Sequence, residues 1–389
     1  MNNCVLHVLC SIDERDGGPV RAVFDLSAEA LPLGYSADIL GFGSDVRVQS
    51  KFPLSRVHVL PGGRYPSLRD ALALRKWLRA NLHKYRGLIL HGMWLWQLAV
   101  CAFEATQHHV PYACFPHGML DFWPWRGQGF LKRIKKQVYW HLIEHHSFDN
   151  ASQVFFTTHR ELENAHQLVP IHPHQSLVLP YGVSFESERI SLPCRNDLIK
   201  CEDEMWCLFL SRIHPKKNLE FLLRAWRMAV VPPNWKLMIA GTGDSDYLAK
   251  LGLLVLELDL TRSVRFTGHV SGGDKTYLFQ NADLFLLPSN QENFGVAVLE
   301  AIHHGCPVLV SDEVYIAEFF HPDYPILSLD LDRWAKEITR ILGDGGYREN
   351  LNRMNFDHLK LRFSISVVAR EWGRTMENAF SNETTAKML

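Results

Sequence analysis

The chain has 389 residues, of which 47% are hydrophobic and 21% charged, so we expect more than one water-soluble domain. The formal net charge of −1 provides no overall field for nucleic acid or another polyanion. The apolar run at 4–10 is too short for a secretory signal, and no stretch approaches the ~20 apolar residues of a membrane-spanning helix, so we expect a cytoplasmic protein.

In the first half of the chain, short apolar runs typical of strands alternate with runs of helical period. The expected strands lie at 5–9, 37–41, 57–60, 88–91, 113–116, 154–157 and 177–180. Helices are expected at 67–81, 95–105 and 129–146.

The second half repeats this alternation. Strands are expected at 206–210, 236–240, 264–267, 284–288 and 307–310, and helices at 219–230, 247–258, 274–281 and 295–304. Near-continuous apolar strands between helices predict parallel sheets that are covered on both faces. The predicted fold class is therefore α/β, with two doubly wound Rossmann-like domains facing a central crevice. They are expected at 1–185 and 205–362, joined by a linker at 186–204 and followed by a helix at 363–380 that packs back toward the first domain and a tail at 381–389.

Four residues in the first half are candidates for a site. Gly17 and Gly18 follow the first strand and allow close backbone approach to a ligand, although an ordinary glycine-rich turn is the alternative. The pattern is not Gly-x-Gly-x-x-Gly, so a dinucleotide site is not indicated. His91 and His117 each end a strand, at the edge expected to face the crevice. For His91 an ordinary structural histidine is the preferred interpretation.

The helix expected at 129–146 is amphipathic. Its apolar stripe consists of Leu131, Ile134, Val138 and Leu142. Its first half carries the basic residues Lys132, Arg133, Lys135 and Lys136, and it is preceded by Trp123 and Trp125. An interfacial helix combines a basic face with aromatic anchors, which would place the protein peripherally on an anionic membrane. The alternative is a helix packed on the core of the first domain with a solvated basic face.

Cations cluster after the first strand of the second half. Arg212, Lys216 and Lys217 follow 206–210, and Asn218 is a candidate N-cap for the next helix. Cations at the carboxyl end of a strand would stabilise a diphosphate leaving group. Alone, such a cluster is more often a solvated loop.

Two carboxylates flank the start of the helix at 295–304. Glu292 lies in the preceding loop and Glu300 within the helix, so both are expected to border one crevice from different sides. The first-turn N–H groups at 293–296 are suited to binding phosphate. Glu300 lies among apolar residues and needs a partner, which is either a ribose diol or a neighbouring cation.

Four segments follow one another in a set order and spacing: SRIHPKKNLE, AGTGDSD, FTGHV and ENFGVAVLEAIHHGCPVLVSD. Together with GGPV at 17–20 and FPHGML at 115–120, they resemble the family 4 glycosyltransferases, whose central signature is the Glu-x7-Glu pair. The resemblance covers most of the chain. It departs from the family pattern in one place, since EVYIAEFF after Asp312 lacks the usual glycine.

The resemblance implies a GT-B fold and a retaining transfer of a hexose from a nucleotide diphosphate sugar. It assigns Arg212 and Lys217 to the pyrophosphate, Glu300 to the ribose and Glu292 to the transferred sugar. It places His117 near the reaction centre and Val270 near the base, and implies backbone contacts to phosphate at Asn293, Phe294, Gly295 and Val296. Glu292 is not assigned as a nucleophile, because a front-face transfer needs none.

The implied acceptor is a glycan or a lipid-linked glycan of bacterial polysaccharide or glycoconjugate assembly. No cofactor or essential metal is expected besides the donor. The Asp-x-Asp patterns at 244–246 and 330–332 resemble those of metal-dependent transferases, but Asp330 and Asp332 precede a helix and are interpreted as caps. A sugar-nucleotide epimerase on the same fold and a non-catalytic nucleotide-sugar-binding partner are the alternative functions.

Overall fold

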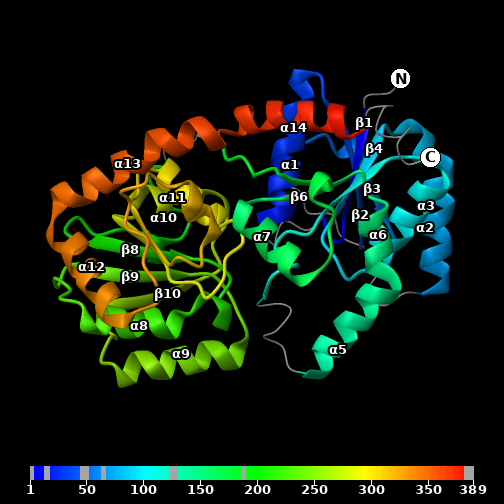
Figure 1. Cartoon of the computed structure of the whole chain (residues 1–389). Helices are drawn as coiled ribbons and strands as arrows, with labels where there is room; N and C mark the ends of the chain where they lie inside the picture. The colour runs from blue at the N-terminus through cyan, green and yellow to red at the C-terminus, as the bar shows by residue number, and fades with distance from the viewer. Residues whose placement is uncertain are drawn as a thin grey trace. The chain divides into compact units, whose positions relative to one another are not determined.

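A computed structural model of the chain describes residues 4–12, 18–43, 52–62, 67–122, 130–184 and 190–380, without the side chains of 130–133. It divides into two compact units (Figure 1). Unit 1 comprises Met1–Gly182 and the C-terminal stretch from Phe363, and unit 2 comprises Val183–Arg362. Residues 190–204, where the sequence predicts a linker, belong to unit 2 and are held to it by bonds such as Lys200 Nζ to Asp283 Oδ2 at 2.7 Å.

Unit 1 contains a seven-stranded parallel sheet in the order β3-β2-β1-β4-β5-β6-β7. Its strands are β1 (Cys4–Leu9), β2 (Ser36–Phe42), β3 (Val57–Leu60), β4 (Gly87–His91), β5 (Tyr112–Phe115), β6 (Gln153–Phe156) and β7 (Ser176–Val178). Its helices are α1 (Gly18–Ala30), α2 (Leu68–Asn81), α3 (Trp96–Gln107), α5 (Phe130–Tyr139), α6 (His145–Asp149), α7 (His159–Leu168) and α14 (Ile365–Ala379).

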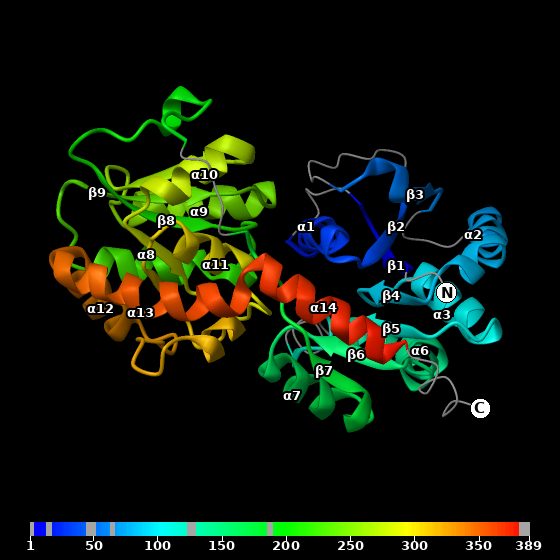
Figure 2. The same ribbon diagram turned by 90° about the horizontal axis from the view of Figure 1, so that it is seen from above.

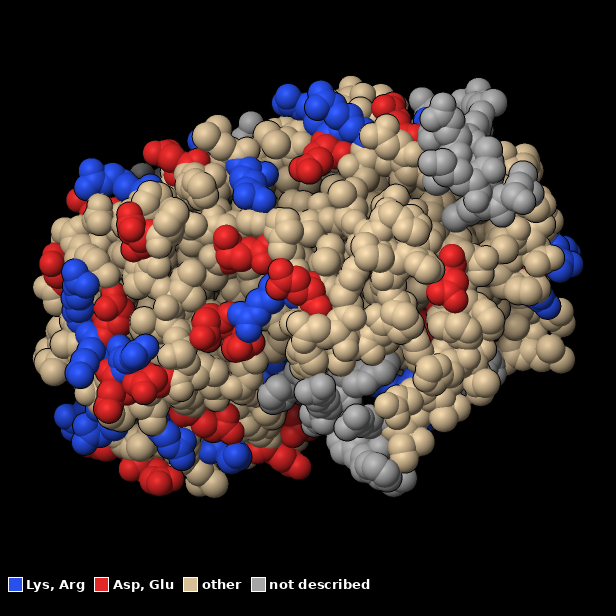
Figure 3. Space-filling model, viewed as in Figure 1, with Lys and Arg blue, Asp and Glu red and all other residues tan. Residues whose placement is uncertain are grey.

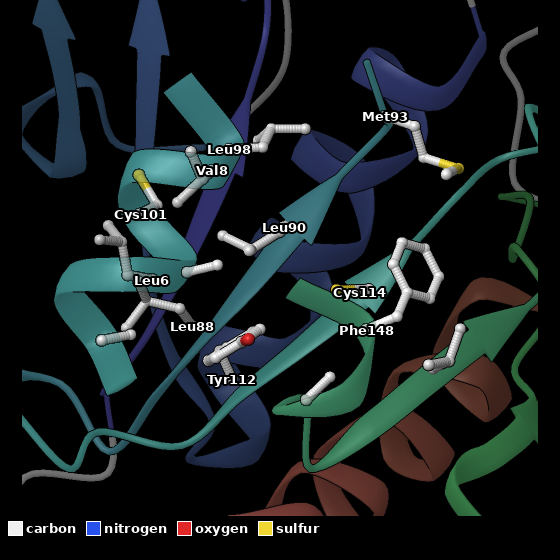
Figure 4. Packing of buried hydrophobic residues seen from close by; sticks show 14 of the residues in the cluster. Leu6, Val8, Leu88, Leu90, Met93, Leu98, Cys101, Tyr112, Cys114 and Phe148 are labelled. Atoms are coloured by element: carbon white, nitrogen blue, oxygen red, sulfur yellow. The ribbon is translucent and has the colours of Figure 1, made fainter. Parts of the chain in front are cut away.

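The two faces of this sheet are covered by different helices. Alternate residues of β1, β4 and β5 point to the face covered by α2, α3 and α6, where side chains such as Leu6, Leu88 and Cys101 pack together (Figure 4). The residues between them face the opposite side, where α1 packs on the sheet and α14 lies against α1 (Figure 2). Both faces of the sheet are therefore shielded from water, as near-continuous apolar strands predict.

Unit 2 contains a five-stranded parallel sheet in the order β10-β9-β8-β11-β12. Its strands are β8 (Met205–Leu210), β9 (Trp235–Ala240), β10 (Val264–Gly268), β11 (Leu284–Leu287) and β12 (Val308–Val310). Its helices are α8 (Leu219–Met228), α9 (Ser245–Glu257), α10 (Gly272–Asn281), α11 (Val296–His303), α12 (Leu331–Gly343) and α13 (Gly345–Phe363). On the visible face of unit 2, acidic and basic side chains intermingle (Figure 3).

The amphipathic segment at 129–146 differs from the expected single helix. It consists of α5, a π-helical turn at Trp140–Glu144 and α6. Figure 1 shows α5 standing out from the sheet of unit 1. The core-packed alternative is wrong for its apolar stripe, because Ile134, Val138 and Leu142 are 41%, 51% and 69% exposed. Trp123 and Trp125 lie outside the described residues.

Candidate functional site

In each sheet the strand order reverses at one point, between β1 and β4 in unit 1 and between β8 and β11 in unit 2. Parallel α/β sheets bind ligands at the carboxyl ends of the strands that flank such a point. In unit 2 these ends lead into the loops that carry Arg212, Lys217 and Glu292. The topology therefore brings together residues that lie about 80 positions apart in the sequence.

Hydrogen bonds between the two loops join Lys217 to Glu292. The Asn290 N–H donates to the Lys216 carbonyl at 2.8 Å, and the Asn290 side-chain amide donates to the Pro215 carbonyl at 3.3 Å. Lys217 lies in the short 3₁₀ turn Pro215–Lys217, and its Nζ donates to Oε2 of Glu292. The two side chains are only 10% and 21% exposed, so the pair is largely withdrawn from water.

The cations around Glu292 keep its carboxyl ionised. Burial alone would raise the pKa of Glu292, but the charge and hydrogen bond of Lys217, with the charges of Lys216 and Arg212, hold that pKa below its ordinary value. The pKa of His214 is lowered, first by burial and then by the same three cations. Arg212, Lys216 and Lys217 thus place positive charge around Glu292, and their binding of a diphosphate stays a prediction.

Glu300 lies on α11 and has a cationic partner that the sequence did not identify. Lys275 on α10 donates from Nζ to Oε1 of Glu300 at 2.6 Å, and the two side chains are 21% and 22% exposed. The neighbouring-cation alternative is therefore confirmed for the structure as it stands. A bond from Glu300 to a ribose remains a prediction, and it would have to share or displace Lys275.

The loop before α11 has a fixed backbone. Gly295 has a φ of 77°, in the left-handed region where glycine is favoured, and α11 begins one residue later than expected, at Val296. Phe294 is 2% exposed, so it would offer a ligand its backbone and not its ring. The Glu292 N–H donates to the Glu313 carbonyl at 2.8 Å, and the Tyr315 N–H donates to the Glu292 carbonyl at 3.0 Å. The segment after Asp312 that lacks the family glycine thus forms a bridge to the Glu292 loop.

Two glycines of the AGTG segment position the Arg212 loop. A Cβ on Gly241 would collide with the Ser211 carbonyl oxygen, and one on Gly243 with the Ile213 carbonyl oxygen. These two carbonyls flank Arg212, which is exposed. Asn218 occupies the N-cap position of α8, as predicted, but in a left-handed conformation and without a side-chain capping bond. Val270 is half-buried, two residues beyond β10 at the same sheet edge.

In unit 1, Gly17 lies outside the described residues and Gly18 is the first residue of α1. His91 ends β4 with both ring nitrogens bonded: Nε2 is 2.9 Å from His7 Nδ1, and Nδ1 is 2.8 Å from His117 Nε2. His91 is thus satisfied at both ring nitrogens, as the preferred interpretation expects. His117 is turned into unit 1, because its other nitrogen, Nδ1, contacts the Tyr181 hydroxyl.

The turn after His117 is held by a buried carboxylate that sequence reasoning missed. Glu161, in the first turn of α7, is fully buried. It accepts the Gly118 N–H at 2.6 Å and the N–H and hydroxyl of Thr157 at 2.7 and 2.8 Å. The spacing from Thr158 to Glu161 matches a capping box and could have predicted where α7 begins. It could not have predicted the bond to Gly118, 43 residues away.

The acidic pairs at 244–246 and 330–332 serve helix starts. Asp330 accepts the Arg333 N–H at 2.8 Å and so caps α12, as predicted, while Asp332 lies in the first turn. Asp244 caps α9 in the same way. In the described ranges, no three His, Cys, Asp or Glu side chains gather closely enough to hold a metal ion. Among the helices of those ranges, none is both long and apolar enough to cross a membrane.

Comparison with known proteins supports the same division of the chain. Residues 195–356 match the family model "Glycosyl transferases group 1", and residues 17–182 match "Glycosyl transferase 4-like domain". An uncharacterised glycosyltransferase of Methanocaldococcus jannaschii is 32% identical over 174 residues, which are 44% of each chain. An alpha-1,3/1,6-mannosyltransferase of Kluyveromyces lactis is 27% identical over 333 residues, or 72% of this chain and 64% of that protein. The chain thus spans about half the length of these curated relatives.

The fold has solved counterparts as well. The crystal structure of Anabaena HepE in complex with UDP and glucose superposes with a TM-score of 0.75 at 18% identity, covering 96% of this chain and 99% of that one. At this identity the likeness concerns the fold, which is two parallel-sheet α/β domains of GT-B type. With both halves matched by glycosyltransferase family models, the chain belongs to the family 4 type, or group 1, glycosyltransferases.

Proposed function

We propose that this protein is a retaining glycosyltransferase that transfers a hexose from a nucleotide diphosphate sugar to a glycan or lipid-linked acceptor. The observation that carries the proposal is the pair of lysine–carboxylate contacts, Lys217–Glu292 and Lys275–Glu300, beside the switch point of the unit 2 sheet. The named activity of the yeast relative and the UDP and glucose bound to the similar structure support a hexose donor.

Each group has a role in donor binding. Arg212 and Lys217 would stabilise the diphosphate as negative charge develops on it, with the backbone N–H groups that begin α11. The Glu300 carboxylate would accept the hydroxyls of the ribose, and ionised Glu292 would accept a hydroxyl of the transferred sugar. Lys217 would then exchange or share its bond to Glu292 with a phosphate oxygen, so donor binding and the rearrangement of this pair are coupled.

The transfer itself follows a front-face course in this proposal. The bond between sugar C1 and the phosphate oxygen breaks, and the acceptor oxygen forms a bond to C1 on the same face. The acceptor proton passes to an oxygen of the leaving nucleoside diphosphate. Because Glu292 is occupied by Lys217, it is suited to positioning and charge stabilisation and is not assigned as a nucleophile. Catalysis needs no cofactor other than the donor.

A thermal-shift screen against UDP-, GDP- and ADP-sugars tests donor binding, because a ligand that binds the folded state raises its apparent stability. We expect one base to stabilise the wild type and to stabilise Glu300→Gln much less. Glu220→Gln, which alters another paired carboxylate of unit 2, is the matched control and should respond as wild type. Stabilisation by none of the donors would contradict the proposal. Sugar interconversion without any acceptor would identify an epimerase.

The exposed apolar stripe of α5 and of the π-helical turn that follows it favours an acceptor at a membrane surface. Val138 and Leu142 are exposed together with Lys135, while Lys136 lies over the Trp94 ring at 5.4 Å. Apolar side chains beside basic ones suit an anionic leaflet, to which each basic residue contributes ~1 kcal/mol. The protein would then be peripheral at the inner face of the cytoplasmic membrane.

Sedimentation with anionic vesicles tests this contact. Wild type should pellet at low salt and dissociate as salt screens the attraction. Replacing the four basic residues at 132, 133, 135 and 136 by glutamine, or Val138 and Leu142 by glutamine, should abolish pelleting. Glutamine at Leu253 and Leu256, which are similarly exposed on α9, should leave it unchanged. Equal partitioning of all variants would point to a soluble acceptor.

A further inference from the structure

Three histidines of unit 1 form a continuous chain of ring contacts. Nδ1 of His7 is 2.9 Å from Nε2 of His91, and Nδ1 of His91 is 2.8 Å from Nε2 of His117. The chain continues from His117 Nδ1 to the hydroxyl of Tyr181. It thus runs from the middle of β1 to the segment that follows β7.

The strand register explains why these rings meet. His7 and His91 point to the same face of the sheet, because Leu9 of β1 is paired with His91 of β4 and side chains alternate along each strand. His7 is therefore the diagonal neighbour of His91. His91 is in turn paired with Phe115 of β5, two residues before His117. The register of β1, β4 and β5 therefore places the three rings in one line.

The rings meet nitrogen to nitrogen and not face to face. Their centroids are 5.2 Å apart for His7 and His91 and 5.1 Å for His91 and His117, and the ring planes differ by 13° and 4°. With nitrogens less than 3 Å apart, such rings lie end to end in nearly parallel planes. An N–H of one ring can then point along the lone pair of the next, which is the favoured hydrogen-bond geometry.

The surroundings keep each ring neutral. Phe115 stacks on His117 at 4.1 Å, and Trp372 of α14 stacks on His7 at 5.5 Å. Burial lowers the pKa of His7 and that of His117 to about 3 and lowers that of His91 well below its ordinary value. A neutral imidazole has one donor and one acceptor nitrogen. His91 and His117 must therefore each accept from one neighbour and donate to the other, and His7 at the end takes the complementary role toward His91, so the three tautomers are set together.

Tyr181 determines the donor-to-acceptor direction of the hydrogen bonds between the three rings. Its hydroxyl is buried and stays protonated, because burial raises the pKa of Tyr181 well above its ordinary value. A phenol is a better hydrogen-bond donor than a neutral imidazole N–H, and an imidazole nitrogen is a better acceptor than a phenol oxygen. The Tyr181 O–H therefore donates to Nδ1 of His117. Nε2 of His117 then donates to Nδ1 of His91, and Nε2 of His91 donates to Nδ1 of His7.

We propose that His7 and His91 are positioning residues for His117: headed by Tyr181, the chain holds all three rings in the tautomer that carries its proton on Nε2. The inference rests on the proposed function only through the position near the reaction centre that the family resemblance implies for His117. It assigns to His7, which does not contact His117, control over the tautomer and orientation of that ring. His117 and Gly118 both have left-handed backbones, with φ of 52° and 75°, so a ring anchored from both nitrogens also holds this turn.

Nitrogen-15 NMR of histidine-labelled protein tests the chain, because a protonated and an unprotonated ring nitrogen have different chemical shifts. The wild-type spectrum should show His7, His91 and His117 protonated on Nε2 alone, assigned through single substitutions. Tyr181→Phe should change the signals of all three rings. Tyr112→Phe removes another buried hydroxyl of unit 1, which donates to the Ser147 carbonyl at 2.8 Å, and should leave them unchanged.

His7→Phe retains an aromatic ring against Trp372 and removes the acceptor at the end of the chain. It should change the His117 signals and lower kcat at least fivefold, with an unchanged Kd for the nucleoside diphosphate, which binds in unit 2. Mixed tautomers in the wild type, or His117 signals unaffected by both Tyr181→Phe and His7→Phe, would overturn the inference. If no sugar transfer is detected with any donor, the proposed function fails. The NMR result still shows whether the three histidines form the proposed series of hydrogen bonds.

Discussion

Replacing Lys217 by methionine should destabilise unit 2 by leaving the Glu292 carboxylate without its partner. Lys217 and Glu292 are 10% and 21% exposed, so the pair is far less solvated than Lys250–Glu220, a 3.1 Å pair of the same unit whose side chains are 68% and 23% exposed. Breaking a fully buried pair costs ~3–5 kcal/mol. Because Glu292 retains some exposure, we expect a coupling energy between Lys217 and Glu292 of about 2–3 kcal/mol. For the exposed pair we expect ~0.2–1 kcal/mol.

Two double-mutant cycles measure these coupling energies, one with Lys217→Met and Glu292→Gln and one with Lys250→Met and Glu220→Gln. Because the chain has two units, a single unfolding curve would mix their transitions. Hydrogen exchange of the β8 and β11 peptides in increasing urea reports on unit 2 alone. A coupling energy for Lys217–Glu292 no larger than that for Lys250–Glu220 would refute the reasoning.

Three further predictions concern ligand, metal and pH. Glu300→Ala should weaken nucleoside diphosphate binding, and Arg212→Ala should lower turnover, each by roughly tenfold to a hundredfold, since a charged hydrogen bond contributes ~1.5–3 kcal/mol; calorimetric and kinetic values within twofold of wild type would contradict this. EDTA should leave the transfer rate unchanged, and a loss that magnesium or manganese restores would show a metal requirement. Because the folded-state pKa of His7 and of His117 is about 3 and the unfolded value is about 6.5, the unfolded chain binds more protons in that range. Stability should therefore fall with decreasing pH below about 6.5, by up to ~1.4 kcal/mol per pH unit for each histidine. His7→Phe should reduce that slope when the stability of unit 1 is followed by hydrogen exchange of the β1 and β4 peptides in urea, and an equal slope would contradict the assignment.

The sequence predicted the sheets and the site loops well because both depend on local patterns. Every expected strand is present within one or two residues, since apolar runs bounded by turns identify buried parallel strands. The strand ends placed Arg212, Lys217 and Glu292 at one edge of a sheet, and the structure brings Lys217 and Glu292 into contact.

The partners of these residues could not be predicted, because they depend on register between distant elements. Lys275 reaches Glu300 from another helix, and Glu161 reaches Gly118 across 43 positions. His7 and His91 offered a weak signal, as both occupy alternate positions of apolar strands that point to one face. Only the pairing of β1 with β4 makes them neighbours. The exposure of the apolar stripe along α5 and the following π-helical turn could not be predicted either, because an amphipathic pattern does not show what covers its apolar face.

The most direct test of sugar transfer is the fate of C1 of the donor. A nucleotide sugar of the base selected by the thermal-shift screen, carbon-13 labelled at C1, is incubated with the protein and an acceptor pool of membrane glycolipids and soluble glycans and followed by NMR. We predict one new anomeric signal with the configuration of the donor, released nucleoside diphosphate in equal amount, and a slower rate for Arg212→Ala. A product of inverted configuration would contradict the retaining course. Donor that binds and is never transferred would contradict the central claim.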